Sequence, residues 1–198
     1  MNYLTKLYRS LILDSELYQE IKTDEQLTRQ ALFTVLLVAI IEIFFYIEPD
    51  GGLISTILNI LGRFVKWCLW AFFIAFLGTR IVPEPMTESN REEFIRTLGF
   101  AYAPGILYIF TFLPGVIGAV IIPYVVSLWQ LSSMVVAAKQ TLNFSSTTRA
   151  IGVCVVASIL LFFIAAVSLA FSWIFGLIGE AIIYPWENPF IEPVSSET

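Results

Sequence analysis

The sequence predicts an all-α membrane protein, a bundle of five transmembrane helices with an N-terminal cytoplasmic amphipathic helical segment. The first observation is composition: 58% of the residues are aliphatic, aromatic or cysteine, and the mean hydropathy is +0.81. Charged residues make up 14% of the chain, whereas a soluble domain typically has about a quarter. The second is that the apolar residues gather in long runs between polar turns, and the third is an uneven distribution of basic residues around those runs.

Residues 1–30 form the predicted cytoplasmic segment. Four apolar residues near its start recur at helical spacing: Leu4, Leu7, Tyr8 and Leu11. Such a helix can lie on the membrane surface or pack on the protein's own loops, and the sequence leaves both interpretations open. The stretch from Thr23 to Gln26 has the form of a capping box, which predicts that a new helix begins there and enters the membrane.

The membrane domain is predicted to cover residues 31–179 in five spans. Their approximate bounds are 31–47, 64–82, 94–113, 116–138 and 150–178. A helix needs about 20 residues to cross the hydrocarbon core, so the first span is near the lower limit and the last exceeds it. The apolar segment 53–61 is interpreted as an interfacial lead-in to the second span, and residues 180–198 as an acidic external tail.

The basic residues predict the orientation of these spans, because cytoplasmic loops carry an excess of Lys and Arg. With a cytoplasmic N-terminus and five spans, nine of the eleven basic residues fall on the cytoplasmic side. They are Lys6, Arg9, Lys22, Arg29, Arg80, Arg91, Arg96, Lys139 and Arg149. The C-terminus is then external, and only Arg63 and Lys66 break the pattern.

The third and fourth spans are predicted to form a hairpin of two helices with an internal proline each, joined by a tight turn at 113–115. A membrane bundle tolerates such prolines because neighbouring helices can compensate for the lost hydrogen bond. Small residues at four-residue spacing also allow close approach of two backbones. The residues predicted to set helix packing or kinks are Gly99, Tyr102, Pro104, Gly105, Gly115 and Pro123.

Three charged residues are predicted to lie near the outer ends of the first two spans. Glu42 is the only carboxylate within a span, and Arg63 and Lys66 begin the second span at the same outer level. An isolated charge there is costly, so we predict an intramembrane ion pair between Glu42 and Arg63 or Lys66. The alternative is that both bases extend outward to lipid headgroups while Glu42 contacts water.

Two amide side chains, Asn59 and Gln130, are candidates for polar contacts within the bundle. The simplest role for Gln130 is a hydrogen bond between helices. A water-filled cavity lined by Gln130, Asn59 and Tyr102 would instead favour transport, and a dry, tightly packed bundle would favour an adaptor.

The sequence offers little for catalysis. It contains no histidine, its three aspartates lie outside the predicted spans, and it has no phosphate-binding loop or nucleotide fingerprint. We therefore expect no enzyme activity, no metal, no cofactor and no nucleic-acid binding. The depths of Cys68 and Cys154 should differ by roughly 15–20 Å, too far for a disulfide, so both thiols are predicted to be free.

Three segments resemble the prokaryotic members of the Yip family, membrane proteins named for the eukaryotic Ypt/Rab-interacting proteins. They are the helix start from Leu13 to Asp24, the segment Gly99–Pro104, and the connection Ala137–Ala150. The resemblance covers roughly residues 11–175, and it implies a five-span bundle with a cytoplasmic N-terminus. Eukaryotic members are associated with Rab GTPases and vesicle traffic, but the short polar segment before the first span argues against a GTPase role here.

Two functions are expected. The first is a non-catalytic membrane scaffold or adaptor that binds partner proteins or organises the bilayer. The alternative is a small oligomeric transporter or channel with a polar site among Glu42, Arg63, Lys66 and Gln130. The expected partners are the lipid bilayer, an unidentified membrane or peripheral protein and further copies of the chain, and the expected location is the prokaryotic plasma (inner) membrane.

Overall fold

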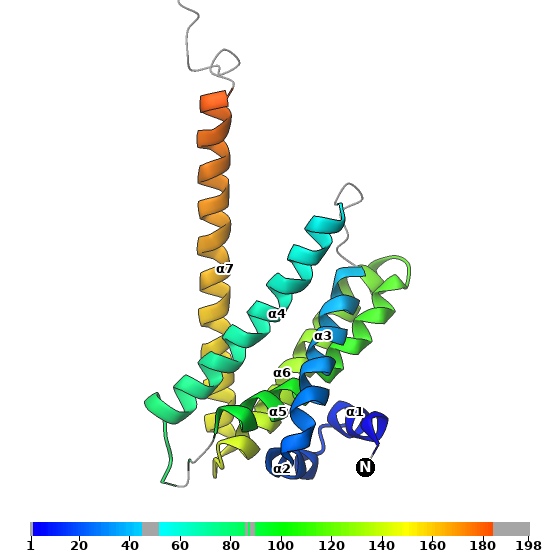
Figure 1. The fold of residues 1–198 in the computed structure, drawn as a ribbon, viewed down its shortest axis with the longest axis vertical. Coiled ribbons are helices and arrows are strands. Elements are labelled where there is room, and N and C mark those ends of the chain that lie inside the picture. The colour runs from blue at the N-terminus through cyan, green and yellow to red at the C-terminus, as the bar shows by residue number, and fades with distance from the viewer. Residues whose placement is uncertain (1, 45–51, 86, 88–89, 184–198) are drawn as a thin grey trace, which may run out of the picture. The chain divides into compact units, whose positions relative to one another are not determined.

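The computed structural model describes residues 2–44, 52–85, 87 and 90–183. Within these ranges the secondary structure is entirely helical, which confirms the all-α prediction (Figure 1). Five helical segments are long and apolar enough to cross a membrane. They are Glu25–Ile43, Leu53–Ile81, Arg91–Phe112, Ile117–Thr141 and Thr147–Gly176.

The chain divides into two compact units, Met1–Ser158 and Ile159–Thr198. The second unit, in its described part, consists of the later turns of one helix, α7 (Thr147–Ile183). Nearly all of the side chains described in these turns are exposed. The helix continues through residues 180–183, which the sequence assigned to the acidic tail; residues 184–198 lie outside the described ranges.

Two short helices open the first unit, α1 (Tyr3–Leu11) and α2 (Ser15–Thr23). They lie at one end of the bundle, where α2 packs on α5 and α6 (Figure 1). The Asp14 side chain caps α2 by accepting a hydrogen bond from the Glu16 amide, 3.0 Å away. A polar side chain in this position satisfies one of the amides left unpaired at a helix start.

The first span begins with a 3₁₀ turn, η1 (Glu25–Leu27), and continues as α3 (Thr28–Phe44). Its cap is Asp24, which accepts from the Gln26 amide at 3.1 Å. The capping box predicted with Thr23 is therefore wrong in its capping residue, although a helix does begin here. Thr23 instead donates its hydroxyl to the Glu20 carbonyl at the end of α2. The predicted end of this span at residue 47 lies outside the described ranges.

The second span is one helix, α4 (Leu53–Phe76), followed by a π-helical turn, η2 (Leu77–Ile81). The segment 53–61, interpreted from the sequence as a separate lead-in, is continuous with it. Only 11% of the apolar stretch of this segment is buried within the structure. Most of its surface is therefore exposed.

The predicted hairpin is present, and its prolines change the helix type. The helix α5 (Arg91–Ala101) gives way to a 3₁₀ helix, η3 (Ala103–Phe112), at Pro104. After the turn, a π-helical segment, η4 (Ile117–Ile121), precedes α6 (Ile122–Thr141), which has Pro123 in its first turn. The two limbs pack together through α6 and η3.

The glycines of this region have two different roles. A Cβ on Gly99 would lie 2.8 Å from the Cβ of Ala31, so this glycine lets α5 approach α3 closely. Gly115 has φ +75° and no atom within 4 Å of a Cβ position. Its predicted role in helix packing is therefore wrong: it supplies the left-handed backbone of the turn.

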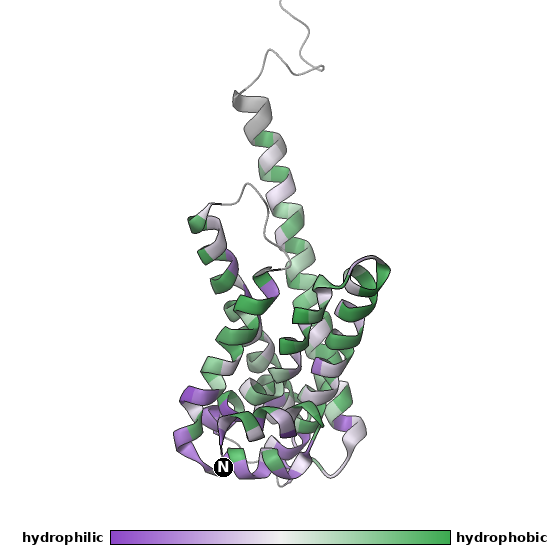
Figure 2. Ribbon diagram, turned by 90° about the vertical axis from the view of Figure 1, so that its right-hand side faces the viewer, coloured by the Kyte–Doolittle hydropathy of each residue, from purple (hydrophilic) through white to green (hydrophobic). Residues whose placement is uncertain are grey.

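The side chains of the first unit are segregated along the bundle. Hydrophilic residues gather at the end that carries α1 and α2, and apolar residues cover the surfaces above it (Figure 2). The core lies beneath the two short helices, where Leu17, Tyr18, Ile21 and Phe100 are fully buried. The N-terminal helices are thus part of the hydrophobic core of this unit.

Candidate functional site

A cavity of about 350 Å³ lies within the first unit, among side chains of all five candidate spans. Most of the residues around it are polar or charged. The lining consists of Glu42, Arg63, Lys66, Trp70, Tyr102, Tyr108, Ser127, Gln130, Leu131 and Ser158. A water-filled cavity lined by Gln130, Asn59 and Tyr102 is the feature expected of a transporter; Gln130 and Tyr102 line this cavity and Asn59 does not.

The carboxylate of Glu42 is the centre of the hydrogen bonds in this cavity. Arg63 Nη1 lies 2.6 Å from Glu42 Oε2, and the Tyr102 hydroxyl donates to Oε1 at 3.0 Å. The Glu42 side chain is 6% exposed and that of Arg63 is 21% exposed. Each carboxylate oxygen therefore has a donor, as the burial of a charge requires.

The change from α to 3₁₀ helix supports Tyr102. Its carbonyl accepts hydrogen bonds from the Gly105 amide at 3.0 Å and from Gln130 Nε2 at 3.4 Å. A Cβ on Gly105 would overlap with side-chain atoms of Gln130 and Val38. A glycine at this position therefore leaves room for the Gln130 amide beside the Tyr102 backbone.

Two donors of the cavity have no acceptor among the described residues. The Lys66 side chain is exposed and has no partner among the residues that the structure describes. The indole N–H of Trp70 is buried and also lacks a hydrogen-bond acceptor there. Arg63, Lys66 and Trp70 lie on α4 at spacings of three and four residues, which places all three on one side of that helix.

The structure brings together five of the residues singled out from the sequence: Glu42, Arg63, Lys66, Tyr102 and Gln130. Asn59 is not among them, because its side chain is exposed on α4 and donates to Ser55 Oγ at 3.5 Å. Tyr102, predicted as a packing residue, instead supplies the second donor to Glu42.

Sequence reasoning missed four polar or indole-bearing residues of the lining: Trp70, Tyr108, Ser127 and Ser158. Tyr108 and Ser127 share a hydrogen bond of 2.9 Å across the hairpin. Tyr108 lies six residues before Pro114 and Ser127 thirteen residues after it, so their positions along the chain gave no signal for this pairing.

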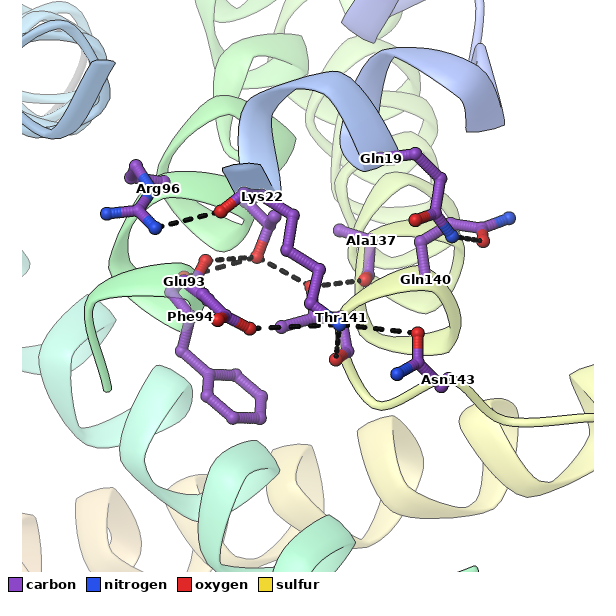
Figure 3. Close-up of polar contacts among 10 residues, drawn as sticks. Gln19, Lys22, Glu93, Phe94, Arg96, Ala137, Gln140, Thr141 and Asn143 are labelled. Carbon is purple, nitrogen blue, oxygen red and sulfur yellow. Dashed lines mark hydrogen bonds and ion pairs between the residues drawn. The ribbon is translucent and has the colours of Figure 1, made fainter. Parts of the chain in front are cut away.

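A second group of polar side chains joins α2 to the ends of α5 and α6 (Figure 3). Lys22 Nζ donates to the Thr141 carbonyl at 3.0 Å and to Asn143 Oδ1 at 3.2 Å, and lies 3.7 Å from Glu93. Arg96 Nη2 donates to the Lys22 carbonyl at 2.8 Å. We call this group the polar clamp: Lys22, Glu93, Arg96, Thr141 and Asn143. One donor in it, Arg96 Nε, is buried without a partner in the described residues.

A buried hydroxyl chain lies beside the clamp. The Tyr18 hydroxyl is 2.9 Å from Ser10 Oγ and 2.7 Å from Ser133 Oγ, and Ser10 donates to the Phe100 carbonyl at 2.6 Å. In an α-helix that carbonyl would accept from the amide four residues later, but Pro104 has no N–H. Ser10 therefore supplies the hydrogen bond that the proline removes. Burial raises the pKa of Tyr18.

Charge pairs at this end hold loops and short helices in place. Arg9 pairs with Asp14 at 2.5 Å and with Glu20 at 2.8 Å, and its guanidinium lowers the pKa of Asp14. Glu84 accepts from the Ser145 amide at 3.0 Å and lies 3.3 Å from Arg149. The Ser145 amide is the main cause of a lowered Glu84 pKa.

The described residues contain no group of three or more His, Cys, Asp or Glu side chains that could hold a metal ion. Cys68 is exposed and Cys154 is buried, and both are free thiols. The chemistry that the cavity can offer is therefore hydrogen bonding and charge.

Comparison with protein-family models, curated proteins and solved structures gives no match to this chain.

Proposed function

We propose that this chain is an integral membrane protein that binds a small polar solute in the cavity between its helices, as a transporter or channel. The cavity lined by Glu42, Arg63, Lys66 and Gln130 carries the proposal. Its volume of about 350 Å³ is within the range of small-molecule sites, about 300–1,000 Å³. Ionisable side chains within membrane-spanning segments are by default candidates for a functional site.

Membrane insertion is supported by the five apolar segments and by the surface of α1. The buried face of α1 includes Leu7 and Ser10, while Leu4, Tyr8 and Ile12 are 68%, 62% and 54% exposed. These three residues recur every fourth position, as in helices that lie in the membrane interface. The short helix thus combines both interpretations left open by the sequence: it packs on the bundle and presents an apolar face outward.

The proposed orientation has a cytoplasmic N-terminus and an external C-terminus, in a prokaryotic plasma membrane. It rests on the distribution of basic residues and agrees with the architecture that the Yip resemblance implies. Reporter fusions after Met86 and at Thr198 should give opposite signals. Equal signals from the two fusions would overturn this orientation.

A scaffold that associates with other membrane proteins or with itself is the second candidate, and the surface of α4 favours it. Asn59 and Ser55 are polar residues on this largely unburied helix. Interhelical hydrogen bonds to such residues promote helix association in membranes. Under this candidate the cavity would be a structural void closed to solutes.

Access to the cavity from water separates the two candidates. The test introduces Ser127→Cys into a protein with Cys68→Ala and Cys154→Ala, reconstituted in vesicles and treated with a charged, membrane-impermeant methanethiosulfonate. Such reagents need a hydrated thiolate, so the cavity thiol should react at least about tenfold faster than one that faces lipid. The matched control is Val125→Cys, since Val125 lies on the same helix and is 46% exposed on its outer surface. Equal, slow labelling of both variants would reject solute access and favour the scaffold.

A further inference from the structure

We propose that the ligand of this cavity is an anionic oxygen group, a carboxylate or a phosphate, held by Lys66. This inference rests on the proposed function in that it uses the same cavity. It concerns the charge of the ligand, which the cavity volume alone does not specify.

Among the described residues that line the cavity, Glu42 is the only carboxylate, and both of its oxygens already have donors. Glu42 Oε2 accepts from Arg63 at 2.6 Å and Oε1 accepts from Tyr102 at 3.0 Å. A cation could bind Glu42 only by displacing Arg63 or by sharing its site with a fixed positive charge. The geometry therefore does not favour a cationic ligand.

The remaining lining groups are mainly donors. Lys66 presents an ammonium group and Trp70 a buried indole N–H, and neither has an acceptor among the described residues. A buried N–H without a partner is uncommon in proteins and calls for an explanation. An oxyanion in the cavity would supply acceptors to both groups.

The charge of the cavity lining also favours an anionic ligand. The described lining residues carry two cations, Arg63 and Lys66, and one carboxylate, Glu42. Pairing of Arg63 with Glu42 leaves one positive charge among them, that of Lys66. This charge attracts an anion.

Such an anion can come from solution or from the headgroup of a lipid. The experiment measures thermal unfolding of the detergent-purified full chain in two arms. The soluble arm compares inorganic phosphate or succinate with sodium chloride at equal ionic strength. The lipid arm compares micelles that contain phosphatidylglycerol with micelles that contain phosphatidylcholine.

In at least one arm, the wild-type unfolding temperature should rise by about 5 °C at a saturating anion concentration. Lys66→Gln should abolish the rise and Lys66→Arg should retain it. Arg80→Gln is the matched control, because Arg80 is an exposed basic residue at the far end of the same segment and has no partner among the described residues. Non-specific stabilisation by phosphate would raise the unfolding temperature of all four proteins equally.

A rise in the soluble arm assigns a dissolved anion, and a rise in the lipid arm alone assigns a headgroup. No rise in either arm, or an equal rise in Lys66→Gln, overturns the inference. Its failure is separate from that of the proposed function: labelling of Ser127→Cys without an anion effect leaves a solute cavity of other specificity. An anion effect that depends on Lys66, without labelling, would retain the anion site and reject solute access.

Discussion

The cavity and the polar clamp both place charged groups among helices, but they differ in how those groups are paired. In the clamp, Lys22 has three partners from two other segments, and Arg96 donates to the α2 backbone. In the cavity, Lys66 and the Trp70 indole have no partner in the described residues and lie beside open volume. Polar groups paired across elements hold those elements together, whereas unpaired donors around a cavity can serve a ligand. The five predictions below test this contrast.

The largest effect is expected from Arg63→Gln, which leaves the Glu42 carboxylate buried without its cation. Breaking a buried pair from one side typically costs about 3–5 kcal/mol; the 21% exposure of the Arg63 side chain places the expected loss near the lower end. The measurement is the unfolding temperature in detergent, with Arg80→Gln as the control for loss of a surface charge.

The double variant Glu42→Gln with Arg63→Gln should be considerably more stable than Arg63→Gln alone. Removal of both charges leaves no unpaired ion, so the two changes should not be additive. Strictly additive losses would show that the two side chains do not interact and that Glu42 reaches water.

A smaller effect is expected for Tyr18→Phe, which removes the hydroxyl that joins Ser10 to Ser133. Because this hydroxyl is buried, the loss of its hydrogen bonds should destabilise the protein by about 1–3 kcal/mol. Labelling of Ser127→Cys should be unchanged, since Tyr18 does not line the cavity. A change in labelling without a loss of stability would argue against a purely structural role for this chain of hydroxyls.

Lys22→Met should cost about 1–2 kcal/mol, because it removes hydrogen bonds between a charged donor and two acceptors while keeping the apolar part of the side chain. Chemical denaturation should show the loss, and limited proteolysis should cut earlier between α1 and α3. Arg29→Gln is the control, since Arg29 is exposed and its side chain has no hydrogen bond or ion pair among the described residues. Equal stability of the two variants would show that the clamp does not hold α2 in place.

The smallest effect on stability is expected from Asp14→Asn, and it depends on pH. Arg9 lowers the pKa of Asp14 in the folded state, so the stability from this pair is present above the unfolded pKa of about 3.9. It is lost as the pH falls through the lower folded value. Asp14→Asn should therefore destabilise the protein by less than about 1 kcal/mol at pH 7 and by less still near pH 3. A difference that grows toward low pH would contradict the pairing; Glu25→Gln is the control.

The helices could be predicted because membrane-length apolar runs, prolines and capping residues act locally. The turn at Gly115 and the five apolar segments follow from such signals. The helix types could not be predicted in this way. The sequence contains Pro104 but does not show that the α-helix becomes a 3₁₀ helix there. That change depends on which neighbours can satisfy the freed backbone groups.

The cavity could be predicted only in part. The charges of Glu42 and Arg63 stand out within apolar runs of the sequence, and they predicted one part of the cavity lining. Tyr108, Ser127 and Ser158 are ordinary residues of membrane helices, and their presence at the cavity depends on helix rotation. Rotation is set by packing contacts such as Gly99 on Ala31, which no local pattern encodes.

The hydrogen bond from Ser10 to the Phe100 carbonyl has a consequence for biosynthesis. The two residues are separated by 90 positions, and Tyr18 and Ser133 by 115. During translation the N-terminal residues emerge first, yet Phe100 in α5 and Ser133 in α6 are made much later. These long-range contacts of the earliest part of the chain can therefore form only after α5 and α6 have been synthesised.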